Sequence, residues 1–288
     1  IHYNAFTGAV EDLGIPLEGE SWPYHVYDPQ RHLLFGAGHY GNVLAYDTRE
    51  RRLIYGGPPK LGIAWYNRCV MLDPDTGVIY STDSPAEKIG DIFNPGPNED
   101  KTFKHYLVSY QRRNNTFTRL RCYSPENPVL GRSGAVRAHT KRKTAEGAFW
   151  CFDHYGTMFK FFPAQERVEL VGTNWGERGK YTTNMCLSPG GRYVYYIPGA
   201  DAQAWKYGTP VVQLDTQTKG KKVLAFLYEF YVDKYGYGPP GTYGLELDEK
   251  GESLFFYMNG RFAEKGQPAS YGRPAIFHLH IPASERPE

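Results

Sequence analysis

The sequence predicts an all-β protein, a β-propeller of about five four-stranded blades, from its composition and from a repeated hairpin. Of the 288 residues, 16% are aromatic, with 24 Tyr, 16 Phe and 5 Trp, and the chain also contains 32 Gly and 21 Pro. Aromatic residues favour strands, and frequent Gly and Pro mark the turns that join them. A hydrophobic content of 41% is enough to form a packed core.

The hairpin occurs five times, each time as a turn followed by an aromatic-rich strand. Asp, Pro or Gly forms the turn, because Asp caps it and Gly readily adopts positive φ. The strands after these turns begin near Leu33, Val78, Ala148, Tyr193 and Leu254. In four of the copies a Tyr-Gly turn, such as His154-Tyr155-Gly156, then precedes a third strand.

Fourth strands are predicted at 53–55, 118–120, 168–171 and 223–226, so that each of the first four repeats supplies one blade. Four-stranded repeats of about 45 to 70 residues are typical of propellers, whose blades stack around an axis. The fifth repeat ends after its third strand, near Ile281. We expect residues 1–18 to supply its fourth strand, since this would cover an exposed edge.

The alternative is a truncated, larger propeller, because residues 1–6 also resemble a third strand. The chain begins at Ile1 without a signal peptide, which fits either a processed form or a fragment. Irregular insertions are expected at 84–102 and 228–242. We find no domain boundary and predict a single domain over residues 1–288.

Charge and cysteine content exclude some classes of partner. A net charge of +2 does not indicate a nucleic-acid partner. No apolar run approaches the roughly 20 residues that a membrane-spanning helix requires. Cys69 and Cys186 alternate with apolar residues in predicted strands, so we expect buried free thiols there. The four Cys do not determine the redox compartment, and the sequence does not indicate an oligomeric state.

The candidate site lies where the innermost strands and their loops converge at one end of the central channel. Arg68 and Arg137 stand out, because strands predicted to be central rarely bury Arg without a partner. The other candidates at these positions are Trp22, Tyr24, His25, Trp65, Tyr66, Asn67, Arg132, His139, Tyr181, Thr183, Asn184 and Tyr243. The Trp residues are expected to pack between blades, and His25 and His139 equally fit hydrogen-bonded core histidines.

Arg, His and Tyr together suit an acidic sugar. Arg binds a carboxylate through two hydrogen bonds, and His or Tyr can take the C5 proton of a uronate and return one to the leaving oxygen. We therefore assign catalytic roles to His139, Tyr243 and Arg137. The predicted substrate-binding residues are His25, Tyr66, Asn67, Arg68, Arg132, His154 and Asn184. His154 shares its turn motif with His39, so a structural role for that turn is the alternative.

No cofactor is indicated. The stretch 73–77 superficially resembles a calcium loop but lacks the remaining ligands, so we expect a hairpin turn there. His278 and His280 point to opposite faces of one strand, which makes a shared metal unfavourable. Structural calcium or zinc is possible but not indicated, and no Gly-rich phosphate loop, HExxH motif or GxSxG motif occurs.

Residues 187–196, LSPGGRYVYY, resemble the general blade turn SPDGRYLYY, and the blade pattern resembles secreted bacterial β-propeller proteins found beside polysaccharide-degrading genes. Residues 131–162 resemble blades of propeller polysaccharide lyases such as the ulvan lyases, in which His, Tyr and Arg carry out the elimination. His139, His154 and Arg137 match these in type, whereas the family's Tyr and second Arg have no aligned counterpart.

The resemblance implies an extracellular or periplasmic lyase that acts on an acidic, uronate-containing oligo- or polysaccharide. The alternative is a non-catalytic propeller that binds a ligand or assembles with other proteins, because a fold does not determine function. A hydrolase or lactonase would need a metal or a carboxylate pair, and the predicted inner strands offer no suitable acids.

Overall fold

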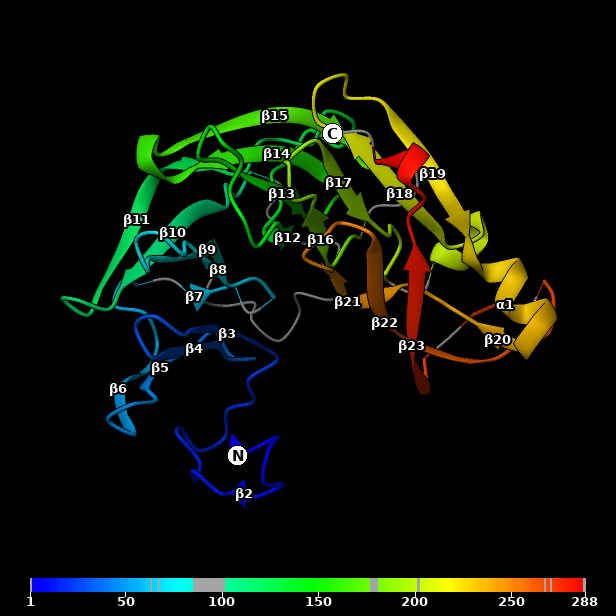
Figure 1. Cartoon of the computed structure of the whole chain (residues 1–288). Coiled ribbons are helices and arrows are strands. Elements are labelled where there is room, and N and C mark those ends of the chain that lie inside the picture. Colours follow the sequence, from blue (N-terminus) through cyan, green and yellow to red (C-terminus); the bar gives the residue numbers. More distant parts are fainter. Residues whose placement is uncertain are drawn as a thin grey trace.

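The structure, a computed structural model, describes residues 2–62, 64–66, 68–84, 102–176, 181–200, 203–266, 268–269 and 271–286. Five antiparallel sheets form the blades of a β-propeller (Figure 1), which confirms the predicted fold class. The innermost strands of the blades lie toward the middle of the arrangement (Figure 1). They therefore bring residues from distant parts of the chain together.

The strands follow one another blade by blade. Blade 1 contains β3 (Tyr24–Asp28), β4 (Leu33–Ala37), β5 (Val43–Asp47) and β6 (Arg52–Gly57). Blade 2 contains β7 (Ala64–Trp65), β8 (Met71–Leu72), β9 (Ile79–Ser84), β10 (Tyr106–Gln111) and β11 (Thr116–Tyr123). Blade 3 contains β12 (Val136–His139), β13 (Phe149–Asp153), β14 (Thr157–Phe162) and β15 (Arg167–Thr173).

Blade 4 contains β16 (Met185–Leu187), β17 (Tyr193–Tyr196), β18 (Pro210–Asp215) and β19 (Lys221–Phe226). Blade 5 contains β20 (Tyr237–Gly238), β21 (Thr242–Leu247), β22 (Ser253–Phe262) and β23 (Arg273–His280). The helical segments are η2 (Pro163–Gln165), η3 (Ala204–Tyr207), α1 (Leu227–Tyr235) and η4 (Ala283–Glu285). A separate hairpin pairs β1 (His2–Tyr3) with β2 (Val10–Glu11).

Aspartates at strand ends fix the turns that the sequence predicted. Asp28 Oδ1 accepts hydrogen bonds from the N–H groups of Gln30 and Arg31. Asp47 and Asp215 accept from the same two positions, whereas Asp153 and Asp248 accept from backbone N–H groups two to five residues further on. Such bonds satisfy backbone donors that would otherwise lack a partner in the turn, so the register of each hairpin follows from a single residue type.

Alternate residues of each central strand enter different hydrophobic cores. In β13, Phe149 and Cys151 pack toward blade 2, whereas Trp150 and Phe152 pack toward blade 4. Four such cores join blades 1–2, 2–3, 3–4 and 4–5. Among the residues that the structure describes, no core joins blade 5 to blade 1, and the blades form an open arc (Figure 1).

The prediction that residues 1–18 complete blade 5 is wrong for this structure. β1 pairs with β2, and the N-terminal segment lies against blade 1 instead. Glu20 accepts a hydrogen bond from Asn42 at 2.7 Å, and Glu11 pairs with Arg51. Trp22 lies close to Gly36, which has no side chain to block it. These contacts hold the segment beside β5 and β6.

The second difference is α1, which forms within the stretch 228–242 that was expected to be irregular. The helix buries Leu227, Tyr228 and Val232 and ends at Gly236, whose N–H donates to the carbonyl oxygens of Tyr231 and Val232. Gly236 has a φ of +61°, a conformation that glycine adopts readily. The other expected insertion, 84–102, lies almost entirely outside the described residues.

Two further expectations concern thiols and membranes. All four Cys are buried free thiols, which confirms the prediction for Cys69 and Cys186. In the described part of the chain, no helix has the length and apolar character needed to cross a bilayer.

Candidate functional site

Arg137 occupies the centre of the candidate site. It lies on β12, and its side chain is only 2% exposed. Its Nε donates to Tyr181 Oη at 2.6 Å, and its Nη1 donates to Tyr24 Oη at 2.8 Å and to the Arg68 carbonyl oxygen at 3.2 Å. The guanidinium also lies 4.7 Å from the Tyr181 ring centroid and 5.1 Å from that of Tyr24. Arg137 thus connects blade 3 with blades 1, 2 and 4.

None of the partners of Arg137 is an anion. In the described part of the chain, no carboxylate forms an ion pair with it, and its hydrogen bonds all go to neutral oxygens. Burial lowers the pKa of Arg137, but the hydroxyls of Tyr24, Tyr181 and Tyr66 raise it, and the net pKa is raised. The guanidinium is therefore a charged group away from water without a counterion among the described residues, which is an energetically costly arrangement.

His154 lies at the edge of this group. It follows β13 directly, and its ring centroid is 4.9 Å from that of Tyr181 in an edge-on arrangement. Burial, followed by the positive charges of Arg137, His105 and Arg132, lowers the pKa of His154 to about 3. Its Nδ1 has no hydrogen-bond partner within the described ranges. At neutral pH the imidazole is therefore uncharged, and its Nδ1 is buried without a partner among these residues.

Two tyrosines add protonated phenols. Tyr66, next to β7, is 1% exposed, and its Oη has no hydrogen-bond partner among the described residues. Tyr243 on β21 donates its hydroxyl to the Ala200 carbonyl oxygen at 3.0 Å. Burial raises the pKa of Tyr66, and burial together with Tyr271 raises the pKa of Tyr243. Both phenols therefore stay protonated and can donate hydrogen bonds.

Two more arginines, Arg68 and Arg132, add positive charge to the surroundings of Arg137 and His154. Arg68 lies between β7 and β8 and is partly buried; burial lowers its pKa, which the nearby Tyr181 opposes. The Arg132 guanidinium lies 4.1 Å above the ring of Tyr155. We refer to the group as the axial cluster, made of Tyr24, Tyr66, Arg68, Arg132, Arg137, His154, Tyr181 and Tyr243.

The axial cluster therefore unites six of the predicted site residues. They are Tyr66, Arg68, Arg132, Arg137, His154 and Tyr243.

The remaining predicted residues lie elsewhere. His139 has Nδ1 3.0 Å from the Thr140 carbonyl oxygen and Nε2 3.1 Å from that of Val70, and burial lowers its pKa. Because main-chain carbonyls occupy both nitrogens, this environment matches the core-histidine alternative, and our proposal below does not rely on His139. His25 follows Tyr24 on β3 and is exposed on the opposite face.

Asn184 donates to Thr183 Oγ1 at 2.9 Å, and no bond connects it to Arg137. Asn67 lies outside the described residues. Tyr24 and Tyr181 were candidates on position alone, and no motif indicated that their hydroxyls accept hydrogen bonds from Arg137. His105, whose charge contributes to lowering the pKa of His154, was not a candidate at all.

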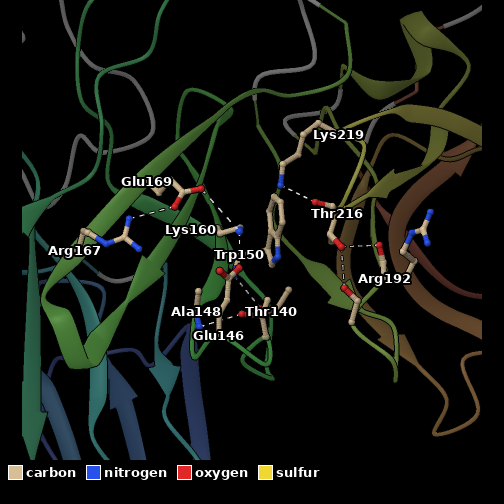
Figure 2. A network of polar contacts seen from close by, with 12 residues as sticks. Thr140, Glu146, Ala148, Trp150, Lys160, Arg167, Glu169, Arg192, Thr216 and Lys219 are labelled. Carbon is tan, nitrogen blue, oxygen red and sulfur yellow. Dashed lines mark hydrogen bonds and ion pairs between the residues drawn. The ribbon is translucent and has the colours of Figure 1, made fainter. Parts of the chain in front are cut away.

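A second charged group lies between blades 3 and 4 and, unlike the surroundings of Arg137, contains carboxylates (Figure 2). Lys160 Nζ lies 2.5 Å from Glu146 Oε1 and 3.9 Å from Glu169 Oε1. The ammonium groups of Lys160 and Lys219 lie 5.4 Å and 4.8 Å from the ring of the buried Trp150. Because carboxylates neutralise this network, we interpret it as a contact that holds the two blades together.

The acidic turn at 73–77 is a hairpin between β8 and β9, as predicted. Lys143 Nζ lies 2.7 Å from Asp73 Oδ1 and 2.7 Å from Asp75 Oδ2, so the carboxylates are ion-paired. A search of the described residues found no group of three or more His, Cys, Asp or Glu that could hold a metal ion.

The blades and their order define the class of protein: a β-propeller with five four-stranded antiparallel blades. No model of a known protein family matches the chain, and no curated protein matches it. Similar solved structures are those of U3-55K, with 12% identity and a TM-score of 0.52, and of the RRP9 WD40 repeats, with 11% identity and a TM-score of 0.55.

Each of the two alignments covers 84% of this chain, which spans 59% of the U3-55K chain and 58% of the RRP9 chain. At these identities the likeness establishes the fold alone. The comparisons give no support to the resemblance to secreted bacterial proteins or to lyases.

Proposed function

We propose that this chain is a ligand-binding β-propeller that holds the carboxylate of an acidic carbohydrate at the axial cluster. The observation that carries the proposal is the buried guanidinium of Arg137, whose partners among the described residues are all neutral oxygens. A ligand carboxylate would supply the missing anion and accept charge-assisted hydrogen bonds. Arg68 and Arg132 would add to the attraction, since both contribute to the positive charge around His154.

The residues around the charge favour a sugar over a simple anion. Tyr24 and Tyr243 are partly exposed. A Tyr ring has an apolar face on which a sugar can stack and a hydroxyl at its edge that can form a hydrogen bond. The phenol of Tyr66 is buried and lacks a partner in the described structure, so its proton remains for a ligand that enters the cluster. Arg68 and His154 are partly exposed as well, so they offer the first contacts above Arg137.

A second candidate is elimination at a uronate, and His154 is the observation that favours it. A neutral imidazole beside Tyr181, with Nδ1 free of a partner among the described residues, could take the C5 proton. Arg137 would neutralise the carboxylate, and protonated Tyr243 or Tyr66 would give a proton to the oxygen that leaves C4. A C4–C5 double bond results. An extracellular or periplasmic location stays a prediction.

Calorimetric titration with uronate oligosaccharides, alongside neutral oligosaccharides of the same length, tests binding. The ultraviolet absorbance of unsaturated uronates, recorded on the same samples, tests elimination. Binding that disappears in Arg137→Met, without any absorbance change, supports the binding module. An absorbance rise that His139→Ala retains and His154→Ala loses supports the elimination. Folded protein that neither binds nor converts any uronate would overturn both.

A further inference from the structure

In the described part of the chain, blade 5 ends with an edge strand that no further strand covers. Blades 1 to 4 finish with the fourth strands β6, β11, β15 and β19. In blade 5, β23 pairs with β22 from Arg273 to His280, and the described residues provide no strand on its other side. An eight-residue edge strand presents free N–H and C=O groups, which proteins normally cover.

The face of blade 5 that points away from blade 4 is apolar and exposed. Phe255 and Tyr257 on β22 are 45% and 41% exposed, and Ile276 on β23 is 82% exposed. In blade 3, Trp150 and Phe152 face the next blade in the same manner and are 0% exposed. The difference arises because another blade covers that face of blade 3, whereas nothing described covers the face of blade 5.

The N-terminal segment, residues 2–20, has the complementary properties. Phe6, Val10 and Ile15 are 100%, 69% and 77% exposed, and the pairing between β1 and β2 involves two residue pairs. The segment contains four acidic residues and no Lys or Arg; the acidic residues are Glu11, Asp12, Glu18 and Glu20. It is therefore an acidic stretch with large apolar side chains in water.

The edge of blade 5 carries the opposite charge. Residues 261–280 contain Arg261, Lys265 and Arg273 with a single carboxylate, Glu264, and β23 also carries His278 and His280. The Arg273 guanidinium lies 4.5 Å from the ring of Phe262, and no described residue forms an ion pair with Arg261 or Arg273. Charge and apolar surface thus match between this edge and the N-terminal segment.

We propose that the N-terminal segment of a second copy of this chain binds along β23 and provides the fourth strand of blade 5. Val10 and Ile15 of one copy would cover Ile276 of the other, and Asp12 would approach Arg273. The contacts with blade 1 hold each segment on the outside of its own molecule, where another copy can accept it. Reciprocal exchange gives a closed two-fold dimer with two equal interfaces.

Cross-linking between two differently tagged chains tests this arrangement. One chain carries Val10→Cys and the other Ile276→Cys, and the four native thiols are buried and do not compete. We expect a short bis-maleimide to form the heterodimer. The control replaces Val10→Cys with Val129→Cys, because Val129 is 79% exposed, at least as exposed as Val10, but lies between β11 and β12. A heterodimer with Val10→Cys alone supports the proposal.

Equal cross-linking by the control, or no heterodimer, would overturn it. A chain that carries both substitutions and cross-links only within itself would also overturn the second-copy assignment.

Sedimentation equilibrium provides a measurement without cross-linker. We expect Arg273→Glu to raise the dimer dissociation constant about tenfold, because the acidic segment would then face a carboxylate. Adding Asp12→Arg to the same chain should restore much of the affinity, since every interface then pairs opposite charges again. A chain that is monomeric at all concentrations, or a dimer that ignores Arg273→Glu, would disprove the proposal.

Discussion

Replacing Arg137 with Met separates a ligand-binding role from a structural one. The substitution removes the charge and keeps a long, flexible side chain. It eliminates three hydrogen bonds from a charged donor, each worth about 1.5–3 kcal/mol. It also removes the desolvation cost of a buried cation, which amounts to several kcal/mol. Because these contributions oppose each other, we expect the free energy of unfolding to change by no more than about 2 kcal/mol.

Ligand affinity should respond much more strongly. Loss of a buried charge that pairs with a ligand carboxylate costs about 2–5 kcal/mol, which corresponds to a roughly 30-fold to several-thousand-fold weaker Kd. Urea unfolding and calorimetric titration of a uronate oligosaccharide measure the two quantities on the same protein. Arg167→Met is the control, because Arg167 is half exposed on β15 and pairs with Glu169. It should change neither quantity appreciably.

A large loss of stability without a loss of affinity would refute the ligand-binding role of Arg137. If Arg137→Met lowered the free energy of unfolding by more than about 4 kcal/mol and left Kd unchanged, the guanidinium would serve to join blades 1, 2, 3 and 4. The absence of a carboxylate beside it would then carry no information about a ligand. Arg137→Lys refines the test, since it keeps the charge but loses the planar fork that binds a carboxylate through two hydrogen bonds.

Three further predictions concern single residues. The pKa of His154 is about 3 in the folded chain against 6.5 for a free imidazole. The unfolded chain therefore binds more protons between these values, and the stability is lost as the pH falls from 6.5 toward 3. His154→Asn should remove this loss, which amounts to at most roughly 5 kcal/mol of unfolding free energy between pH 6.5 and pH 3, as measured by urea unfolding. An unchanged dependence of stability on pH would contradict the low pKa. Tyr66→Phe removes a buried hydroxyl without a described partner, so stability should stay equal or rise by about 1 kcal/mol while uronate binding weakens, and unchanged binding would exclude Tyr66 from the site. Gly241→Ala should lower the free energy of unfolding by about 2–3 kcal/mol, measured by calorimetry, because φ is +150° and the new Cβ would lie 2.5 Å from Ala200 Cα.

The local structure of the blades could be predicted from the sequence because it depends on nearby residues. Asp28 and Asp215 form their turns with backbone groups two and three residues away, so the motif itself contains the geometry. Helix α1 is the counter-example. Its sequence, LYEFYVDKY, is rich in residues that favour strands, and it has no side-chain N-cap. Burial of Leu227 and Val232 overrides that preference, and single-residue propensities do not contain this information.

The site was harder to predict, because its contacts cross the molecule. Arg137 could be identified as a polar residue on an inner strand, but its two phenol partners are 113 and 44 residues away in the sequence. Which of His139 and His154 belongs to the candidate site likewise depends on the residues that surround each ring in the folded chain. Carbonyls of Val70 and Thr140 occupy the first, whereas Arg137 and Tyr181 surround the second. No motif distinguishes the two environments.

The axial cluster contributes to the attachment of blade 1 at one end of the open arc. Blades 2, 3 and 4 each contribute to two hydrophobic cores, whereas blade 1 contributes to the core it shares with blade 2. The hydrogen bond from Arg137 to Tyr24 gives blade 1 a second attachment, to the opposite side of the axis. A ligand carboxylate that engages Nη1 would compete with this bond. If the proposed ligand binds there, its binding and the position of blade 1 are linked through one guanidinium, which would then exchange the Tyr24 hydroxyl for the ligand carboxylate.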